Sequence, residues 1–387
     1  MKSFFLLGRN PSLSVAEILS YLDVRNIEVQ DWELNGNALL IDSEQRLDFK
    51  SMINSLGGTI AAGTASITGS QEEVLDFIEK KDICPWKENK FDYSVIAFCE
   101  RDFEEVIIDA MKSSFKLNKV RAMIKPSLGV VAIQNGARAS GTPTKLLTRD
   151  KLYFIFEGIE TSFGTIAAVF DADASEKRDM NKPVRREELA ISPRMAKILI
   201  NLAELKPGQT VIDPFCGIGG VMQEAMLQDI NAIGVDLDSS ALEGARQNDR
   251  WLKKTYHPTA TSTFILGDSQ RVNISPADGV ATEPSLGQLL KNIVPKEEAY
   301  KMQKRFEDLM IGVIKNSKKS LHRGAKIAFT APYIQTHHAR IGCNSKRILE
   351  ETGLKMSIIK NGKNLAYPIS ELRNKKVVSR EMFVFEY

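Results

Sequence analysis

The chain has 387 residues, more than one ordinary hydrophobic core holds, so two or three domains are expected. Its 43% hydrophobic content, a longest apolar run well short of the roughly 18 residues of a membrane span, and a start without a signal cleavage site exclude membrane-spanning and secreted classes. The four cysteines show no CxxC spacing, so neither zinc nor a disulfide framework is expected, which fits a reducing cytoplasm. No metal site is expected, and the oligomeric state is open, with a monomer favoured. The net charge of +3 is unremarkable as a total.

Residues 1–69 predict the order strand, helix, strand, strand, helix, strand. Ser14 and Glu17 have the spacing of a capping box at the start of the first helix, and Asn35-Gly36 predicts a hairpin between the second and third strands. This order is that of a ferredoxin-like domain, a common arrangement that says little about function by itself.

Residues 70–170 predict a second, α+β domain, with helices near 71–80 and 103–116. Its strands are expected near residues 93–99, 120–124, 129–134 and 152–156. From Lys112 to Lys151 there are nine basic residues and one acid, a net charge of +8 within the segment. Such a segment predicts contacts with a polyanion backbone. The predicted RNA-binding residues are Lys116, Lys119, Arg121, Lys125, Arg138, Lys145, Arg149 and Lys151.

Residues 171–190 are charged and have no apolar period, which predicts a linker. Within it, Lys182, Arg185 and Arg186 could contact RNA phosphates or remain solvated. After the linker, Ser192 as N-cap and Pro193 at the first helical position predict a helix. From Thr210 onward, strands and helices alternate, so residues 191–387 are expected to form a Rossmann-like α/β domain with a mostly parallel, seven-stranded sheet.

Acids and glycines follow the first three strands of this domain. Asp213 ends the first strand and precedes a glycine-rich turn, Asp236 ends the second, and Asp268 follows the third. Met222 stands where a dinucleotide motif needs glycine, and no Walker lysine is present, so S-adenosylmethionine (SAM) is the predicted cofactor. The predicted cofactor-binding residues are Asp213, Phe215, Gly217, Gly219, Gly220, Asp236, Leu237, Asp268 and Ser269.

With "ISPRMAKILINLA" and "DPFCGIGG", the chain resembles the archaeal and eukaryotic tRNA guanine-N2 methyltransferases that modify position ten in the D-arm. The resemblance covers nearly the whole chain. It implies a ferredoxin-like domain, an RNA-binding THUMP domain at 70–170 and a class I SAM-dependent methyltransferase domain at 191–387. It also implies tRNA as the substrate.

The catalytic stretch of that family is typically T-D-P-P-Y-G, and here residues 282–287 read T-E-P-S-L-G. By resemblance, Glu283 and the carbonyl of Pro284 orient the target amine. Ser285 replaces a proline and Leu286 replaces the aromatic residue that stacks on the flipped base. Tyr333, in "TAPY" after the neighbouring strand, is a candidate for the missing ring, with a packed structural tyrosine as the alternative.

Two other functions remain open at this point. The same chemistry could act on rRNA or on an adenine amino group of another nucleic acid. Alternatively, the chain could be an RNA-binding protein whose altered E-P-S-L-G stretch has lost catalysis.

Overall fold

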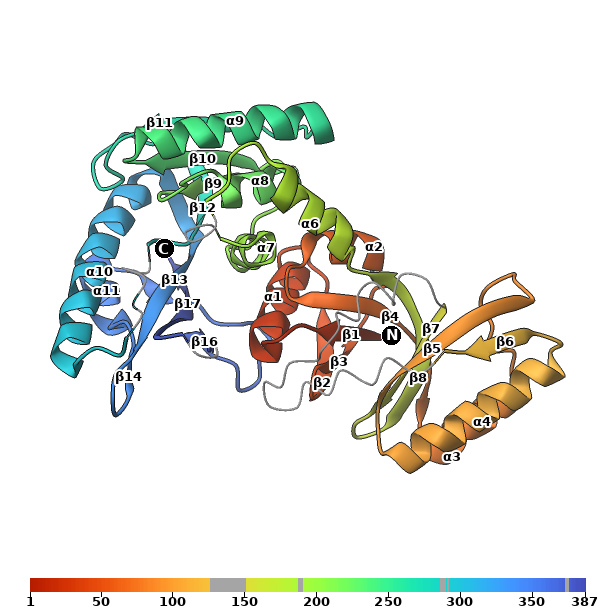
Figure 1. Cartoon of the computed structure of the whole chain (residues 1–387). Helices are drawn as coiled ribbons and strands as arrows, with labels where there is room; N and C mark the ends of the chain where they lie inside the picture. Colours follow the sequence, from red (N-terminus) through yellow and green to blue (C-terminus); the bar gives the residue numbers. More distant parts are fainter. Residues whose placement is uncertain (126–150, 187–190, 286–289, 291, 373–375) are drawn as a thin grey trace. The chain divides into compact units, whose positions relative to one another are not determined.

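The computed structural model describes residues 1–125, 151–186, 191–285, 290, 292–372 and 376–387 (Figure 1). It divides into two compact units. The N-terminal unit consists of residues 1–14, 27–54 and 58–175, and the C-terminal unit of residues 15–26, 55–57 and 176–387. Each unit is built on its own sheet.

The N-terminal unit contains an eight-stranded sheet of order β2-β3-β1-β4-β8-β7-β5-β6. Neighbours pair antiparallel except β5, which is parallel to both β6 and β7. Helices α3 (Gln71–Lys80) and α4 (Arg101–Leu117) pack on this sheet around Tyr93, Tyr153 and Phe163. The strands are β1 (Lys2–Leu7), β2 (Val29–Asn35), β3 (Ala38–Ser43), β4 (Thr59–Gly69), β5 (Lys90–Phe98), β6 (Arg121–Ile124), β7 (Lys151–Glu157) and β8 (Thr161–Val169).

The predicted elements of this unit are present where the structure describes them, including the Asn35-Gly36 hairpin, in which Gly36 has a φ of +56°. The predicted strand at 129–134 lies outside the described residues. One sheet runs through both predicted N-terminal domains, because β4 pairs with β8 over residues 61–69. The domain boundaries at 69/70 and 170/171 therefore stay predictions, since no break in the sheet marks the first of them.

The predicted capping box of the first helix is wrong. Helix α1 (Pro11–Asp23) begins three residues before Ser14, and the Asn10 side chain accepts a hydrogen bond from the Leu13 N–H at 3.1 Å. Proline pre-sets the helical φ at the first helical position, so the helix begins at Pro11. Glu17 instead lies buried and accepts hydrogen bonds from the Gly57 N–H at 2.7 Å and from Asn201 at 2.8 Å.

The segment predicted as a linker also contains a helix that the sequence analysis did not expect. Helix α6 (Ala172–Asn181) has no buried residues, and its first turn is capped by the Asp171 side chain, which accepts from the Ala174 N–H at 2.8 Å. The missing apolar period agrees with the absence of buried residues in α6, although Lys182 just after the helix is buried. It did not exclude a helix, because capping and residues with fair helix propensity also favour one.

In the C-terminal unit, the main path of the sheet has the order β11-β10-β9-β12-β13-β17-β15 (Figure 1). The five neighbouring strands β11, β10, β9, β12 and β13 are parallel to one another, and β17 is antiparallel to β13. The fold is thus an α/β methyltransferase-like fold, and two short strands extend the predicted seven. The strands are β9 (Thr210–Asp213), β10 (Asn231–Asp236), β11 (Ser262–Leu266), β12 (Ala277–Thr282), β13 (Leu321–Gln335), β14 (Arg340–Ile341), β15 (Lys355–Met356), β16 (Ile369–Glu371) and β17 (Val378–Glu386).

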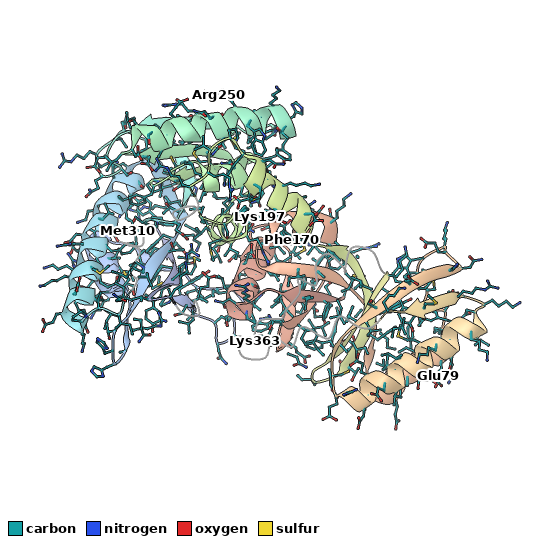
Figure 2. All side chains as sticks on the ribbon, in the orientation of Figure 1. Glu79, Phe170, Lys197, Arg250, Met310 and Lys363 are labelled. Atoms are coloured by element: carbon teal, nitrogen blue, oxygen red, sulfur yellow. The ribbon has the colours of Figure 1, made fainter. Side chains whose placement is uncertain are left out.

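Five helices of this unit follow or precede those strands. They are α7 (Pro193–Leu202), α8 (Gly220–Met226), α9 (Ser239–Tyr256), α10 (Lys296–Ser317) and α11 (Ser345–Thr352). As predicted, Ser192 caps α7 and Pro193 is its first residue. Met310 on α10 is buried against the sheet, whereas Arg250 lies on the exposed side of α9 (Figure 2).

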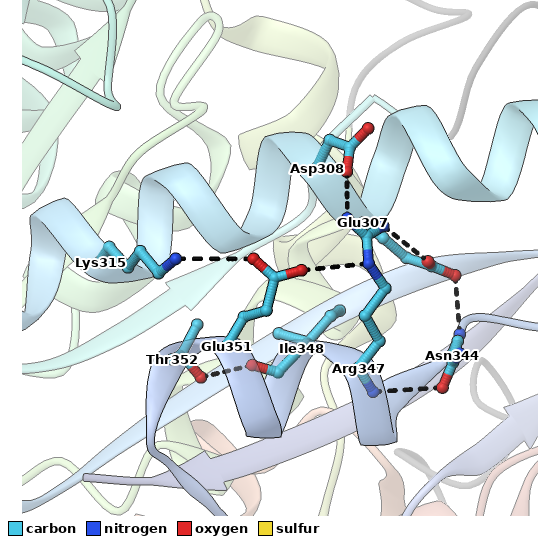
Figure 3. A network of polar contacts seen from close by, with 8 residues as sticks. All are labelled: Glu307, Asp308, Lys315, Asn344, Arg347, Ile348, Glu351 and Thr352. Atoms are coloured by element: carbon cyan, nitrogen blue, oxygen red, sulfur yellow. Dashed lines mark hydrogen bonds and ion pairs between the residues drawn. The ribbon is translucent and has the colours of Figure 1, made fainter.

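Helices α10 and α11 are joined by a polar network centred on Arg347 (Figure 3). Its guanidinium reaches Glu307 at 3.2 Å, Asp308, and Glu351 at 3.2 Å. Asn344 caps α11 and donates its backbone N–H to Glu307 at 2.9 Å. The network holds α11 against α10. In the part of the chain that the structure describes, no helix is long and apolar enough to cross a membrane.

Candidate active site

The carboxyl ends of β9, β10, β11 and β12 lie at one edge of the C-terminal sheet, because these strands are parallel neighbours. Asp213 and Asp236 are the last residues of β9 and β10, and Glu283 follows β12 directly. In open α/β sheets this edge is where ligands bind. The acids predicted from sequence therefore stand at adjacent strand ends.

Asp213 is almost fully buried, with 2% of its surface exposed. Its carboxylate accepts a hydrogen bond from the Thr282 hydroxyl at 2.6 Å and from the Phe215 N–H at 3.2 Å. Burial raises the pKa of Asp213 to about 7, and the nearby carboxylates of Asp236 and Glu283 add to the rise. A cation that entered this site would be attracted to Asp213 and would favour its ionised form.

Asp236 holds the glycine-rich turn in place. One carboxylate oxygen accepts the Gly217 N–H at 2.8 Å, and the other accepts the Asp238 N–H at 2.9 Å. Gly217 has a φ of +51° and Gly219 a φ of +84°, in the region where side chains are strained, and at Gly217 a Cβ would meet no atom within 4 Å. Gly220 begins α8, where a Cβ would lie 2.7 Å from Ile191.

The loop after β11 is tied to the same edge. Ser269 is buried and its hydroxyl donates to the Pro214 carbonyl, while Asn316 of α10 donates to the Ser269 carbonyl at 3.0 Å. Asp268 accepts the Gln270 N–H at 3.0 Å, and Leu237 is exposed. These residues frame the edge, and their contacts with a cofactor stay predictions.

One pocket brings together Asp213 and Glu283. Five predicted residues line it: Asp213, Phe215, Gly217, Gly220 and Glu283. The other lining residues are Lys182, Ile191, Cys216, Ile218 and Val221. The other predicted cofactor-binding residues, Gly219, Asp236, Leu237, Asp268 and Ser269, are not among those that line this pocket.

Glu283 is largely but not fully buried beside Arg380 of β17, whose guanidinium donates to one of its carboxylate oxygens. Burial raises the pKa of Glu283, and Arg380 opposes that rise. Burial likewise raises the pKa of the Cys216 thiol, which therefore stays protonated and fills space in the pocket wall.

The other predicted catalytic residues differ in how far the structure tests them. Pro284 is buried, Ser285 is exposed, and Leu286 lies outside the described residues. Tyr333 is on β13 opposite Ser379, with the Arg340 guanidinium 5.6 Å from its ring centre. No contact between Tyr333 and Glu283 occurs among the described residues, so base stacking by Tyr333 stays a prediction.

The basic segment of the N-terminal unit is partly neutralised by acids that lie before residue 112 in the sequence. Lys112, Lys125 and Lys151 form ion pairs with Asp109 at 2.8 Å, Asp92 at 2.9 Å and Glu88 at 3.0 Å. The net charge of +8 was counted over residues 112–151 only. It therefore overstated the positive charge available to bind RNA, because these three acids precede residue 112. Arg138, Lys145 and Arg149 lie outside the described residues. The remaining predicted residues are all exposed and have no ion pair among described residues: Lys116, Lys119 and Arg121.

Three residues have a place in the site that was not predicted from sequence, among them Lys182, which was expected to contact RNA phosphates or to stay solvated but is buried. Lys182 lines the pocket with 6% of its side chain exposed and pairs with Asp179 at 2.6 Å; Thr282 holds Asp213; and Arg380 holds Glu283. Thr282 could have been recognised because it precedes the motif acid at a strand end. For Arg380, on the last strand, the sequence carries no local signal.

Comparison with known proteins identifies the C-terminal domain. Residues 182–314 match the family described as RMKL-like, methyltransferase domain. The structure of TrmN from Thermus thermophilus aligns with 100% of this chain and 99% of its own, at 15% identity and a TM-score of 0.52, which is a likeness of fold. Residues 182–314 are therefore a methyltransferase domain.

The relatives in sequence are tRNA (guanine(10)-N2)-dimethyltransferases. The protein of Pyrococcus abyssi is 22% identical over 76% of this chain and 81% of its own length. That of Methanothermobacter thermautotrophicus is 27% identical over 37% of this chain, so the match spans only 39% of the relative. The resemblance predicted from "ISPRMAKILINLA" and "DPFCGIGG" is confirmed.

Proposed function

We propose that this chain is a SAM-dependent tRNA methyltransferase that methylates the N2 amine of a guanine in the D-arm, at the position-ten site. The observation that carries the proposal is the shared pocket of Asp213 and Glu283, a buried anion for the methyl donor and a second one for the acceptor. The methyltransferase domain and the named relatives support the same assignment.

The residues of the pocket fit this cofactor. When bound, SAM supplies a methyl group on a positively charged sulfur. Asp213 would take the positive charge of its amino-acid portion, and the Lys182 ammonium, which lines the same pocket, would take the carboxylate. The open space at Gly217 lets the backbone approach the ligand closely. Asp236 and Asp268 would contact the nucleoside.

Glu283 and Pro284 would act on the acceptor amine. The lone pair of a guanine N2 amine is delocalised into the base, so the amine is a poor nucleophile. Glu283 has one buried carboxylate oxygen that accepts no full hydrogen bond from a described residue, with the Thr330 hydroxyl close to the carboxylate, and this oxygen can accept an amine proton. The Pro284 carbonyl would accept the second, which would point the lone pair at the methyl group.

The N-terminal unit would hold the RNA. The order β2-β3-β1-β4 with α2 (Phe49–Ser55) supports a ferredoxin-like domain, although most of its first helix, α1, belongs to the C-terminal unit. Strands β5 to β8 with α3 and α4 support a THUMP domain. Lys116, Lys119 and Arg121, exposed at the end of α4 and the start of β6, would contact tRNA phosphates. A cytoplasmic monomer is part of this proposal.

A methyl-transfer assay on bulk tRNA, followed by mass spectrometry of the nucleosides, tests the assignment. We expect N2-methylguanosine from the unaltered protein and a loss of at least about 100-fold in Glu283→Ala. Glu297→Ala, on the exposed first turn of α10, is the matched control and should retain full activity. Methylated adenosine or rRNA-restricted transfer would contradict the substrate, and tight RNA binding without any transfer would contradict catalysis.

A further inference from the structure

Glu283 is held by an arginine that lies 97 residues further along the chain. Arg380 donates one guanidinium nitrogen to Glu283 and another to Glu371 of β16 at 3.3 Å. Both partners of the first pair are nearly buried, with 8% of the Arg380 side chain and 13% of the Glu283 side chain exposed. This buried arginine between two glutamates lies outside the T-E-P-S-L-G stretch at residues 282–287.

The pair leaves one oxygen of Glu283 available. Oε1 accepts from Arg380, whereas Oε2 is buried and accepts no full hydrogen bond from a described residue, although the Thr330 hydroxyl lies close enough to the carboxylate to help lower its pKa. Glu283 also lines the pocket that contains Asp213. A buried acceptor without a partner costs free energy, which a ligand that donates a hydrogen bond would recover.

The strand order explains why a glutamate stands at this position. Glu283 follows β12 and Arg380 is on β17, with β13 between them. Two strand spacings are about 10 Å, so the two side chains must meet across β13. An aspartate, shorter by one methylene, would not span this gap as well. The departure of Glu283 from the usual aspartate therefore matches the presence of Arg380.

We propose that Arg380 is a positioning residue, which keeps Glu283 ionised and directs its free oxygen toward the acceptor amine. The inference rests on the proposed function. As the new N–C bond forms and the S–C bond breaks, the amine nitrogen loses one proton to Oε2 of Glu283, which then returns that proton to solvent. A carboxyl that is already protonated cannot accept it.

The charges around Glu283 make this role necessary. Arg380 faces it from β17, Glu371 from β16 and Asp213 from β9, and Lys182 lines the same pocket. Burial raises the pKa of Glu283, Glu371 raises it further, and Arg380 lowers it. Without the arginine, two neighbouring acids and little solvent would remain, and Glu283 would be protonated at higher pH.

The test is the pH dependence of kcat/KM for methyl transfer to tRNA. In Arg380→Met, we expect the acidic limb of the profile to move up by about one pH unit or more, with lower activity at pH 7. Arg380→Lys should restore most of the shift because it restores the charge. Glu371→Gln should move the limb in the opposite direction, to lower pH.

Arg347→Met is the matched control, since it removes another arginine that bridges acids in the same unit, remote from the pocket. It should leave the acidic limb in place. A purely structural role of Arg380 would lower activity equally at every pH. An unshifted limb in Arg380→Met, with SAM binding retained in calorimetry, would overturn the inference.

Measurements on Glu371→Gln and on the unaltered protein distinguish a failure of the proposed role of Arg380 from a failure of the proposed function. If Arg380→Met does not fold, Glu371→Gln still decides, because an unmoved or raised limb there contradicts the proposed electrostatics. If the unaltered protein transfers no methyl group to any RNA, the proposed function itself fails. If activity depends on Glu283 but the acidic limb is unshifted in both Arg380→Met and Glu371→Gln, the proposed role of Arg380 is contradicted and the proposed function is not.

Discussion

The two sheets of the molecule place their charged residues differently. In the C-terminal unit, β9 to β12 are parallel, so four carboxyl ends meet at one edge and bring Asp213, Asp236 and Glu283 together. In the N-terminal unit most neighbours are antiparallel, so successive strand ends fall on opposite edges. Its charged residues spread over the surface, and several pair with acids nearby.

This difference shows why one unit suits chemistry and the other suits contact with a large polyanion. Buried acids at a shared edge have perturbed protonation, as the raised pKa values of Asp213 and Glu283 indicate. Exposed lysines and arginines keep their charge and act at longer range. Four sets of substitutions test this difference between the two units.

The largest effect is expected from Gly63→Ala in the N-terminal sheet. A Cβ at Gly63 of β4 would lie 2.0 Å from the Thr165 carbonyl oxygen of β8, and backbone cannot yield cheaply. We expect a loss of about 3 kcal/mol in the free energy of unfolding of this unit, measured by urea denaturation, and a loss of tRNA binding. SAM binding by the C-terminal unit should remain.

The control for this change is Gly312→Ala, whose Cβ would instead meet the end of the flexible Gln270 side chain. It should alter stability little, because that side chain can move and alanine favours the helix. Equal destabilisation by both variants would show that the close approach of β4 and β8 is unimportant.

The next effect is on cofactor affinity and its pH dependence. Asp213 has a raised pKa of about 7, so it is largely protonated below that pH and ionised above it. SAM should therefore bind more tightly as pH rises from 6 to 8. In Asp213→Asn, we expect binding about 30-fold weaker at pH 8, as for the loss of about 2 kcal/mol, and no longer dependent on pH. Calorimetric titration at three pH values measures both.

The same shift has a consequence for stability with the opposite sign. A carboxyl whose pKa is raised by folding favours the folded state below its ordinary pKa, and this contribution is lost as pH rises through about 7. The cofactor-free Asp213→Asn protein should therefore lose less stability between pH 5 and pH 8 than the unaltered protein. A parallel pH dependence in both proteins would contradict the buried ionisation of Asp213.

A smaller effect is expected from replacing Lys116, Lys119 and Arg121 together by glutamine. These exposed residues have no ion pair among described residues, so their loss should weaken tRNA binding about 10-fold and reduce its salt dependence by up to about three counterions. Filter binding at several salt concentrations measures this. Replacing the paired Lys112 and Lys125 by glutamine is the control and should matter less.

The smallest effect is expected from Arg347→Met in the network of α10 and α11 (Figure 3). It should lower the thermal midpoint modestly, and less so at high salt, because exposed ion pairs are screened. Differential scanning calorimetry at low and high salt tests this. A fall as large as that of Gly63→Ala would mean that the network, rather than the apolar core, holds α11.

Much of the fold and part of the site could be predicted from local patterns. The strand-helix alternation after Thr210 and the acid-glycine spacing from Asp213 to Gly220 depend on neighbouring residues, and such patterns are visible in one sequence. The Asn35-Gly36 hairpin and the Ser192 cap are equally local. The cap of α1 was missed because Ser14 and Glu17 fit the same pattern as a true box, while Asn10 and Pro11 start the helix earlier.

The rest depended on pairings between distant segments. Arg380 reaches Glu283 only because the last long strand returns antiparallel beside β13. Lys125 meets Asp92 because β5 and β6 pair in parallel. Neither register can be read from the composition of the segments involved. The structure was therefore needed to show which basic residues are unpaired and which residues surround Glu283.

Thr282 and Glu283 are consecutive, yet the first is bound to Asp213 on one side and the second to Arg380 on the other. A single peptide unit thus fixes the spacing between the donor and acceptor halves of the pocket. Inserting or deleting one residue at the end of β12 would disconnect both halves at once, because neighbouring strand residues point to opposite faces. We therefore expect the junction to tolerate changes of side chain better than changes of length.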